Sequence, residues 1–176
     1  MKHLIFIILL SLAAISTEAQ TVFKEKITFT TSIGSGLSMS TPSSSLFTWQ
    51  VMGHYALSDK WLAGAGTGLS SYEKMLIPLY GDVRFQIGRE RKLTPFAELA
   101  MGYSFAPAKD ANGGVFANPS FGMQFPLKNK NKLQLSIGYQ LQALERVKTH
   151  TDNYLSEEFE EKLNHQSISF KFGLRF

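Results

Sequence analysis

The sequence predicts an all-β fold, an eight-stranded antiparallel up-and-down barrel that crosses a membrane. Three observations favour this fold. Apolar and polar residues alternate strictly over the last ten residues, seven earlier segments alternate in the same way, and the connections between segments are alternately short and long. Period-two alternation gives a strand one apolar and one polar face, and about ten residues is the length that a tilted strand needs to cross a bilayer.

The last segment, SISFKFGLRF at 167–176, is the clearest strand. Its even-numbered residues are apolar, its odd-numbered residues are Ser, Lys, Gly or Arg, and the chain ends on Phe176. This pattern resembles the C-terminal strand of bacterial outer-membrane β-barrels, in which the barrel-assembly machinery reads a terminal Phe. The resemblance implies that Phe176 is an assembly signal.

The other seven strands are expected at 26–37, 47–57, 61–70, 77–88, 95–106, 116–126 and 133–144. Short polar turns follow the second, fourth and sixth strands at 58–60, 89–92 and 128–132. Longer connections span about 38–46, 70–76, 107–115 and 145–166. Short turns at one end and long loops at the other are typical of a transmembrane barrel, and an even strand number places both termini at the end with the short turns.

Residues 1–19 have the pattern of a secretory signal peptide, which leaves 20–176 as the barrel domain. Lys2 and His3 precede an apolar run from Leu4 to Ile15, which is shorter than the roughly 20 residues that span a bilayer as a helix. Ala19 is a suitable small residue before a cleavage site. An uncleaved anchor is the alternative. The chain has no cysteine, which excludes disulfides, thiolate metal sites and a lipoprotein anchor.

Composition excludes some functions. Charged residues make up 18% of the chain, the net charge is only +4, and the basic residues are scattered, which does not suggest a nucleic-acid partner. The sequence contains no cofactor or metal motif. A soluble lipocalin-like barrel that binds a ligand is the alternative fold. The many Gly, Ser and Gln residues on the polar strand faces favour a narrow polar lumen over a solvated exterior.

The segment LIPLYGDVRFQIG at 76–88, followed by TPFAELAMGYSF at 94–105, resembles the small outer-membrane β-barrel domain of Bacteroidetes-type bacteria, which is related to the OmpA and OmpX barrels. In that family the strand often begins with a Pro after an aliphatic residue and carries an inward Arg. The resemblance implies an eight-stranded barrel in the outer membrane of a Gram-negative bacterium, surrounded by lipid and lipopolysaccharide and inserted by the barrel-assembly machinery. It implies no activity.

Five charged residues fall on the polar strand faces and are expected in the lumen: Asp82, Arg84, Glu98, Lys171 and Arg175. An eight-stranded barrel is filled by its own side chains, so charges there must pair. Arg84 and Glu98 lie at similar distances from the turn at 89–92 and are expected to face each other. The set forms either a structural charge network or a gate or proton path. Gly64, Gly66 and Gly68 are expected to leave room for Tyr80 and Arg84.

His165 and Ser167 resemble part of the motif of the outer-membrane lipid A deacylases, and a lipid A-modifying enzyme is therefore an alternative function. That family has an Asn after the Ser, where this chain has Ile168, and only nine residues follow Ser167. The strand phase also directs Ser167 into the lumen. We therefore expect a non-enzymatic protein.

The longest connection, 145–166, is expected to form a short amphipathic helix, because Leu155, Phe159 and Leu163 are spaced by four and Ser156 can cap the helix. It would either offer a surface to a partner or to lipopolysaccharide, or pack over the barrel mouth. The function expected from the whole sequence is a structural, envelope-integrity or surface-interaction role, with a narrow pore as a variant.

Overall fold

A computed structural model describes residues 26–39, 46–72, 74–88, 92–107, 111–127, 131–152 and 155–176. The strands are β1 (Ile27–Ser38), β2 (Leu46–Ala56), β3 (Trp61–Ser71), β4 (Met75–Gln86), β5 (Thr94–Phe105), β6 (Ala111–Asn112), β7 (Gly114–Pro126), β8 (Lys132–Asp152) and β9 (Leu155–Arg175). Within these ranges, no helix is long and apolar enough to cross a membrane. The expected signal peptide at 1–19 lies outside the described residues.

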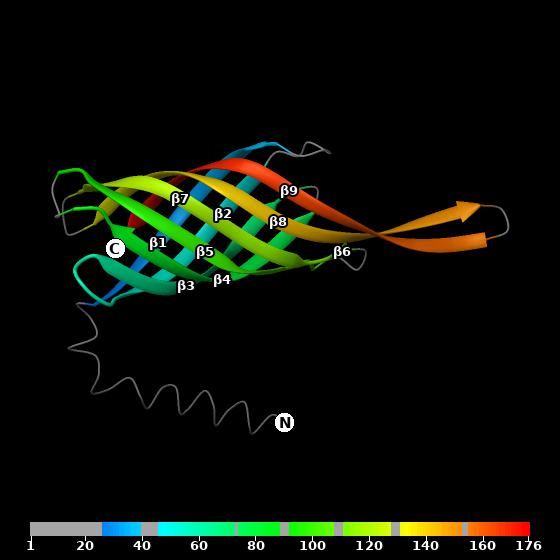
Figure 1. The fold of residues 1–176 in the computed structure, drawn as a ribbon, viewed down its shortest axis with the longest axis horizontal. Coiled ribbons are helices and arrows are strands. Elements are labelled where there is room, and N and C mark those ends of the chain that lie inside the picture. The colour runs from blue at the N-terminus through cyan, green and yellow to red at the C-terminus, as the bar shows by residue number, and fades with distance from the viewer. Residues whose placement is uncertain are drawn as a thin grey trace, which may run out of the picture.

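Eight of these strands form a closed antiparallel up-and-down barrel, which confirms the predicted fold (Figure 1). Each barrel strand pairs with the next one along the chain, and β9 pairs with both β8 and β1, so the sheet has no free edge around the barrel. The two-residue strand β6 stands apart from the barrel and pairs only with β8, at Glu145 and Arg146.

Six of the eight predicted strands have the observed bounds to within two residues, because the alternation that predicts them continues to the ends of the barrel. The short turns come where expected. In the turn after β4, Gly88 has a φ of 88°, which is a left-handed conformation that glycine adopts without strain.

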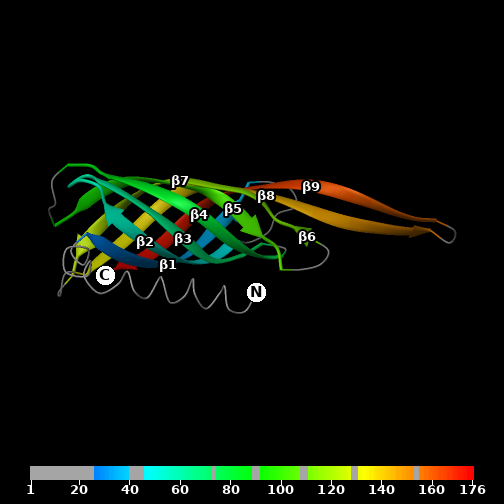
Figure 2. The ribbon, with the colours of Figure 1, turned by 90° about the horizontal axis from the view of Figure 1, so that it is seen from below.

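The predicted helix in 145–166 is wrong. The backbone continues as strand on both sides, so that β8 and β9 are 21 residues long, whereas β1 to β5 and β7 have 11 to 13 residues. The two strands stay paired to Asp152 and Leu155 and project beyond the barrel as a two-stranded hairpin (Figures 1 and 2). We call this end of the barrel the hairpin end and the other, with the C-terminus, the turn end.

The phase of each strand matches the prediction. In β1 to β5, β7, β8 as far as Ala143 and β9 from Asn164, the outer wall is formed by odd-numbered residues of the first seven strands and even-numbered residues of β9. This wall carries exposed apolar side chains such as Phe29, Trp49, Leu79, Ile137 and Phe170. The residues of opposite parity are buried and largely polar. An apolar exterior around a polar interior is the arrangement of a barrel in lipid, and the inverse of a soluble barrel.

Candidate functional site

The lumen is the place where polar and titratable side chains gather in this fold. The barrel has eight strands, a number that encloses a space just wide enough for side chains to fill. The buried charged residues of the described chain are Asp82, Arg84, Glu98, Lys171 and Arg175, together with the histidines His54 and His165. All five charges expected in the lumen therefore lie inside the barrel.

Arg84 and Glu98 form the central ion pair. The register of β4 and β5 places them directly opposite each other, as the sequence predicts. Arg84 Nε donates to Glu98 Oε2 at 2.7 Å, and Nη2 donates to the same oxygen. The guanidinium also lies over the ring of Phe96, 4.4 Å from its centroid. This ring has space because Gly122 lies beside it, and a Cβ at Gly122 would come within 2.4 Å of Phe96 Cζ. The arginine is therefore fixed on two sides.

Next to this pair, His54 on β2 contacts Asp82 on β4, with 2.5 Å between Nε2 and Oδ2. The two side chains meet across β3 because Gly64 lies between them in the register and has no side chain. His54 was not among the sequence-predicted site residues. The apolar–polar alternation of this segment could have identified His54, because it places the histidine on the inward face, and a histidine inside a narrow barrel needs a hydrogen-bond partner.

Lys171 of β9 completes the charged cluster. Its Nζ donates to Gln50 Oε1 at 3.0 Å and to Asn118 Oδ1 at 2.8 Å. These contacts reach across the lumen, from β9 to β2 and to β7. Arg175 is buried nearer the turn end, in register with Thr30 and Lys132. The charged cluster thus occupies the half of the lumen toward the turn end.

An apolar layer lies inside the lumen. Met52, Tyr80, Ala100 and Phe116, from four different strands, form a buried cluster, with the rings of Tyr80 and Phe116 5.3 Å apart. Gly66 makes room for it, since a Cβ there would lie 2.7 Å from both Met52 Cγ and Tyr80 Cζ. The expectation that glycines accommodate Tyr80 thus applies to Gly66. At Gly64 and Gly68 a Cβ would meet the backbone of β2, and neither glycine makes room for Arg84.

The half of the lumen toward the hairpin end is neutral and polar. Gln140 Nε2 donates to Tyr72 Oη at 2.6 Å, and Ser104 Oγ donates to Gln142 Oε1 at 2.7 Å. The ring of His165 stacks on Tyr72 with 5.2 Å between centroids. Tyr72 follows β3 at the rim, and burial raises the pKa of its phenol well above the usual value, so the hydroxyl stays protonated.

His165 and Ser167 both point into this polar half, as the strand phase predicts. The two described carboxylates of the lumen, Asp82 and Glu98, belong to the other half and are engaged by His54 and Arg84. A Ser–His hydrolase needs an acid that orients the histidine and access for the substrate. A lipid in the bilayer reaches the outer wall, whereas Ser167 is buried inside it.

His54, Asp82 and Glu98 also offer ligand atoms that lie within 4.8 Å of one another. A His and two carboxylates are ligand types that transition metals accept. Here, however, Glu98 already accepts two hydrogen bonds from Arg84, and the buried ammonium of Lys171 lies nearby. A divalent cation would face two fixed positive charges, so the donor set does not fit a metal.

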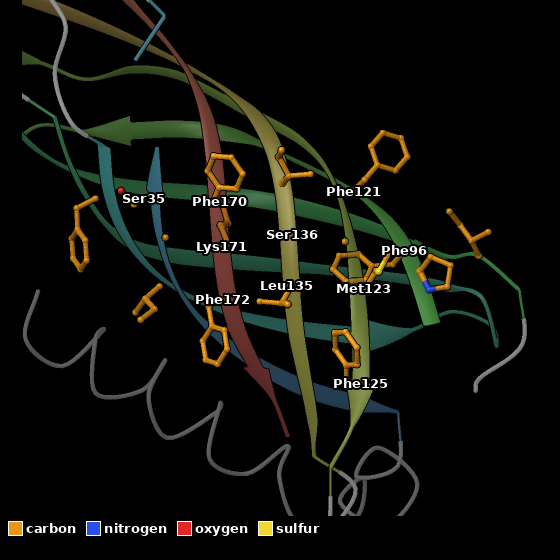
Figure 3. A pocket seen from close by; sticks show the side chains of 17 residues that line it. Ser35, Phe96, Phe121, Met123, Phe125, Leu135, Ser136, Phe170, Lys171 and Phe172 are labelled. Carbon is orange, nitrogen blue, oxygen red and sulfur yellow. The ribbon is translucent and has the colours of Figure 1, made fainter. Parts of the chain in front are cut away.

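The outer wall carries an apolar hollow of about 850 Å³ over β7, β8, β9 and β1 (Figure 3). Phe121, Met123, Phe125, Phe170 and Phe172 stand around it, and small residues of the strands form its floor.

Comparisons with known proteins define the fold. No family model matches the sequence, and no curated protein matches it. Among solved structures, Neisserial surface protein A superimposes with a TM-score of 0.61 at 10% identity, over 85% of this chain and 95% of that chain. The outer membrane protein AlkL, solved in DMPC lipid bilayers, gives 0.54 at 10% identity, over 86% and 89%.

The chain thus has the fold of small eight-stranded outer-membrane β-barrels. A de novo designed transmembrane β-barrel is also similar, with a TM-score of 0.50 at 12% identity over 85% of this chain and 95% of that one. A designed barrel carries no evolved activity, so the shared feature of these neighbours is the architecture and not a reaction.

Proposed function

We propose that this protein is a non-enzymatic outer-membrane barrel of a Gram-negative bacterium, which acts at the cell surface through the β8–β9 hairpin. In this proposal residues 1–19 direct export, the barrel-assembly machinery reads Phe176, and the outer wall lies in lipid and lipopolysaccharide. The turn end then faces the periplasm, and the hairpin end faces outward.

The hairpin is the observation that carries the proposal. In the part of β8 that follows Arg146, the described residues pair only with β9. On the other side, the pairing of β9 with β1 ends at Ser167, so the part of β9 before Ser167 pairs only with β8. There β8 and β9 stay paired with each other, residue by residue, as far as Asp152 and Leu155. The hairpin therefore extends beyond the barrel wall on its own backbone pairing.

The filled lumen argues against the other roles. Met52, Tyr80, Ala100 and Phe116 pack together inside the lumen as an apolar cluster, which disfavours a narrow aqueous pore. The burial of Ser167 within the barrel disfavours a lipid A-modifying enzyme. The apolar outer wall disfavours a soluble lipocalin-like binder.

The test compares three strains: one that lacks the protein, one with the full chain, and one in which residues 147–160, which pair with each other beyond the barrel, are replaced by a short turn. Heat-modifiability on a gel shows whether each barrel is folded and inserted. Adhesion of cells to a surface and to one another measures the interaction role, and sensitivity to detergent measures envelope integrity.

We expect the shortened barrel to insert normally, to restore detergent resistance as fully as the whole chain does, and to fail in adhesion. If the shortened chain restores adhesion fully, the hairpin is not the acting part. If lipid A of the complemented strain changes in mass, or the purified barrel gives steady conductance steps in a planar bilayer, the enzyme or the pore replaces this proposal.

A further inference from the structure

The charged half of the lumen contains a small cavity of about 10 Å³. Its wall includes the polar residues Ser32, Arg84, Glu98, Gln134 and Lys171, and Met52 of the apolar layer and Phe96 also line it. A cavity of this size holds one water molecule or one ion of similar size. It is too small for phosphate, sulfate or an organic ligand.

The wall of this cavity is rich in hydrogen-bond donors. Arg84 uses Nε and Nη2 on Glu98, and its remaining nitrogen, Nη1, has no acceptor among the described residues. Gln134 Nε2 and Ser32 Oγ are likewise buried without a partner there. The ammonium of Lys171 has three N–H donors and donates two of them, to Gln50 and Asn118, which leaves one for the cavity.

The charges of the described lumen favour an anion as well. Arg84, Lys171 and Arg175 oppose two carboxylates, Asp82 and Glu98, which leaves one positive charge in excess. Arg84 is only 1% exposed and Lys171 only 8%. A buried charge without a counter-ion is costly, so an anion beside these two residues would stabilise the barrel.

Water and a halide differ in what they offer this wall. A water molecule could donate to Glu98 Oε1, the oxygen that Arg84 does not use, but it would leave the excess positive charge in place, whereas a halide neutralises it. A halide only accepts hydrogen bonds, which matches the free donors of Arg84, Gln134, Ser32 and Lys171. We propose that the lumen of this barrel binds one chloride ion in the cavity between Arg84, Gln134 and Lys171.

The first test uses the whole barrel refolded in non-ionic detergent, so that each salt is present while the cavity forms. Refolding and heating are done in the sodium salts of chloride, bromide and gluconate at equal ionic strength. We expect the temperature at which the folded gel band disappears to be a few degrees higher in chloride and bromide than in gluconate, and to saturate as chloride rises. Equal temperatures in all three salts would overturn the proposal.

The choice of gluconate separates binding from a general salt effect. Strongly hydrated anions stabilise folded proteins by exclusion from their surface, so a general effect would favour gluconate over bromide. Higher stability in bromide than in gluconate is the reverse of that order and indicates a specific binding site.

A matched pair of variants locates the site. Gln134→Met removes a donor from the cavity wall, and Gln124→Met changes its cross-strand neighbour, which is buried but does not line the cavity. We expect Gln134→Met to lose most of the difference between chloride and gluconate, and Gln124→Met to keep it. The reverse result would contradict the assigned position.

Crystals of the unaltered barrel grown in bromide give a readout that requires no variant. We expect an anomalous peak within hydrogen-bond distance of Arg84 Nη1 and Gln134 Nε2. Electron density at that position with no anomalous signal would show that the cavity holds water, and the proposal would then be wrong.

Discussion

At the scale of single residues, the barrel interior depends on pairs that meet across neighbouring strands. Arg84 and Glu98 face each other because β4 and β5 are joined by a short turn that fixes their register. The sequence predicts this pair, since both residues stand at inward positions at similar distances from the turn. It could not predict that Lys171 reaches Gln50 and Asn118, because contacts across a lumen depend on how the closed barrel brings distant strands together.

The Arg84–Glu98 pair leads to a prediction about stability. Arg84→Gln and Glu98→Gln should each destabilise the barrel by on the order of 3–5 kcal/mol, because each leaves a buried charge without its partner. The double variant should be less destabilised than the sum of the two single variants. The measurement is a double-mutant cycle from urea unfolding in detergent or lipid.

Asp59→Asn serves as the control for this cycle, since Asp59 is exposed in the turn between β2 and β3 and should change stability little. Strict additivity of Arg84→Gln and Glu98→Gln would mean that the two side chains do not interact in the folded barrel.

At the scale of elements, the sequence predicts strands well where one face is apolar and the other polar, and poorly where both faces are mixed. Residues 145–166 show why. The spacing of four between Leu155, Phe159 and Leu163 is close to one helical turn, but four is also an even number, so the same residues share one side of a strand. Pairing with β8 decides between the two, and pairing is not visible in a single segment.

Strand β3 yields a prediction at this scale. Gly66→Ala should destabilise the barrel by about 1–3 kcal/mol, because the new methyl group would lie 2.7 Å from Met52 Cγ and from Tyr80 Cζ in a filled layer. Gly81→Ala, on the neighbouring strand β4, is the matched control. Its Cβ would point outward and meet no atom closer than 4.0 Å, so its stability should be unchanged or slightly higher.

Unfolding midpoints in urea compare the two glycine variants under the same conditions. Equal destabilisation by both would show that the strands themselves resist the substitution and that Gly66 has no special role in accommodating the apolar layer.

At the scale of the whole molecule, the direction of the barrel wall can be tested directly. Single cysteines at Ile137 and Phe170 should react with a lipid-soluble maleimide in membranes, because both side chains lie on the outer wall. Cysteines at Gln140 and Lys171 should be protected, because both side chains are buried in the lumen. Preferential labelling of the second pair would indicate an inverted, soluble type of barrel.

Assembly provides a second prediction for the whole molecule. Removing Phe176 should lower the amount of folded, membrane-inserted protein, because the terminal aromatic residue is the proposed assembly signal. Phe176 exchanges two backbone hydrogen bonds with Phe29, so a variant that keeps this backbone, Phe176→Ala, separates recognition from pairing. Wild-type levels of both variants in the outer-membrane fraction would remove the support for this signal.

The pairing of β9 with both β8 and β1 has a consequence for chain entropy. Most of the neighbouring barrel strands are joined by short connections, so their pairing closes small loops, but Thr30 and Arg175 meet from opposite ends of the chain. The long hairpin eases this last step, because β8 and β9 can zip together from Asp152 and Leu155 as a local unit before either reaches β1. The edge of β9 that will pair with β1 is then already extended. The last step of barrel closure becomes the docking of two preformed strand edges, that of β9 and that of β1. The same residues that project from the finished barrel thus shorten the conformational search that closes it.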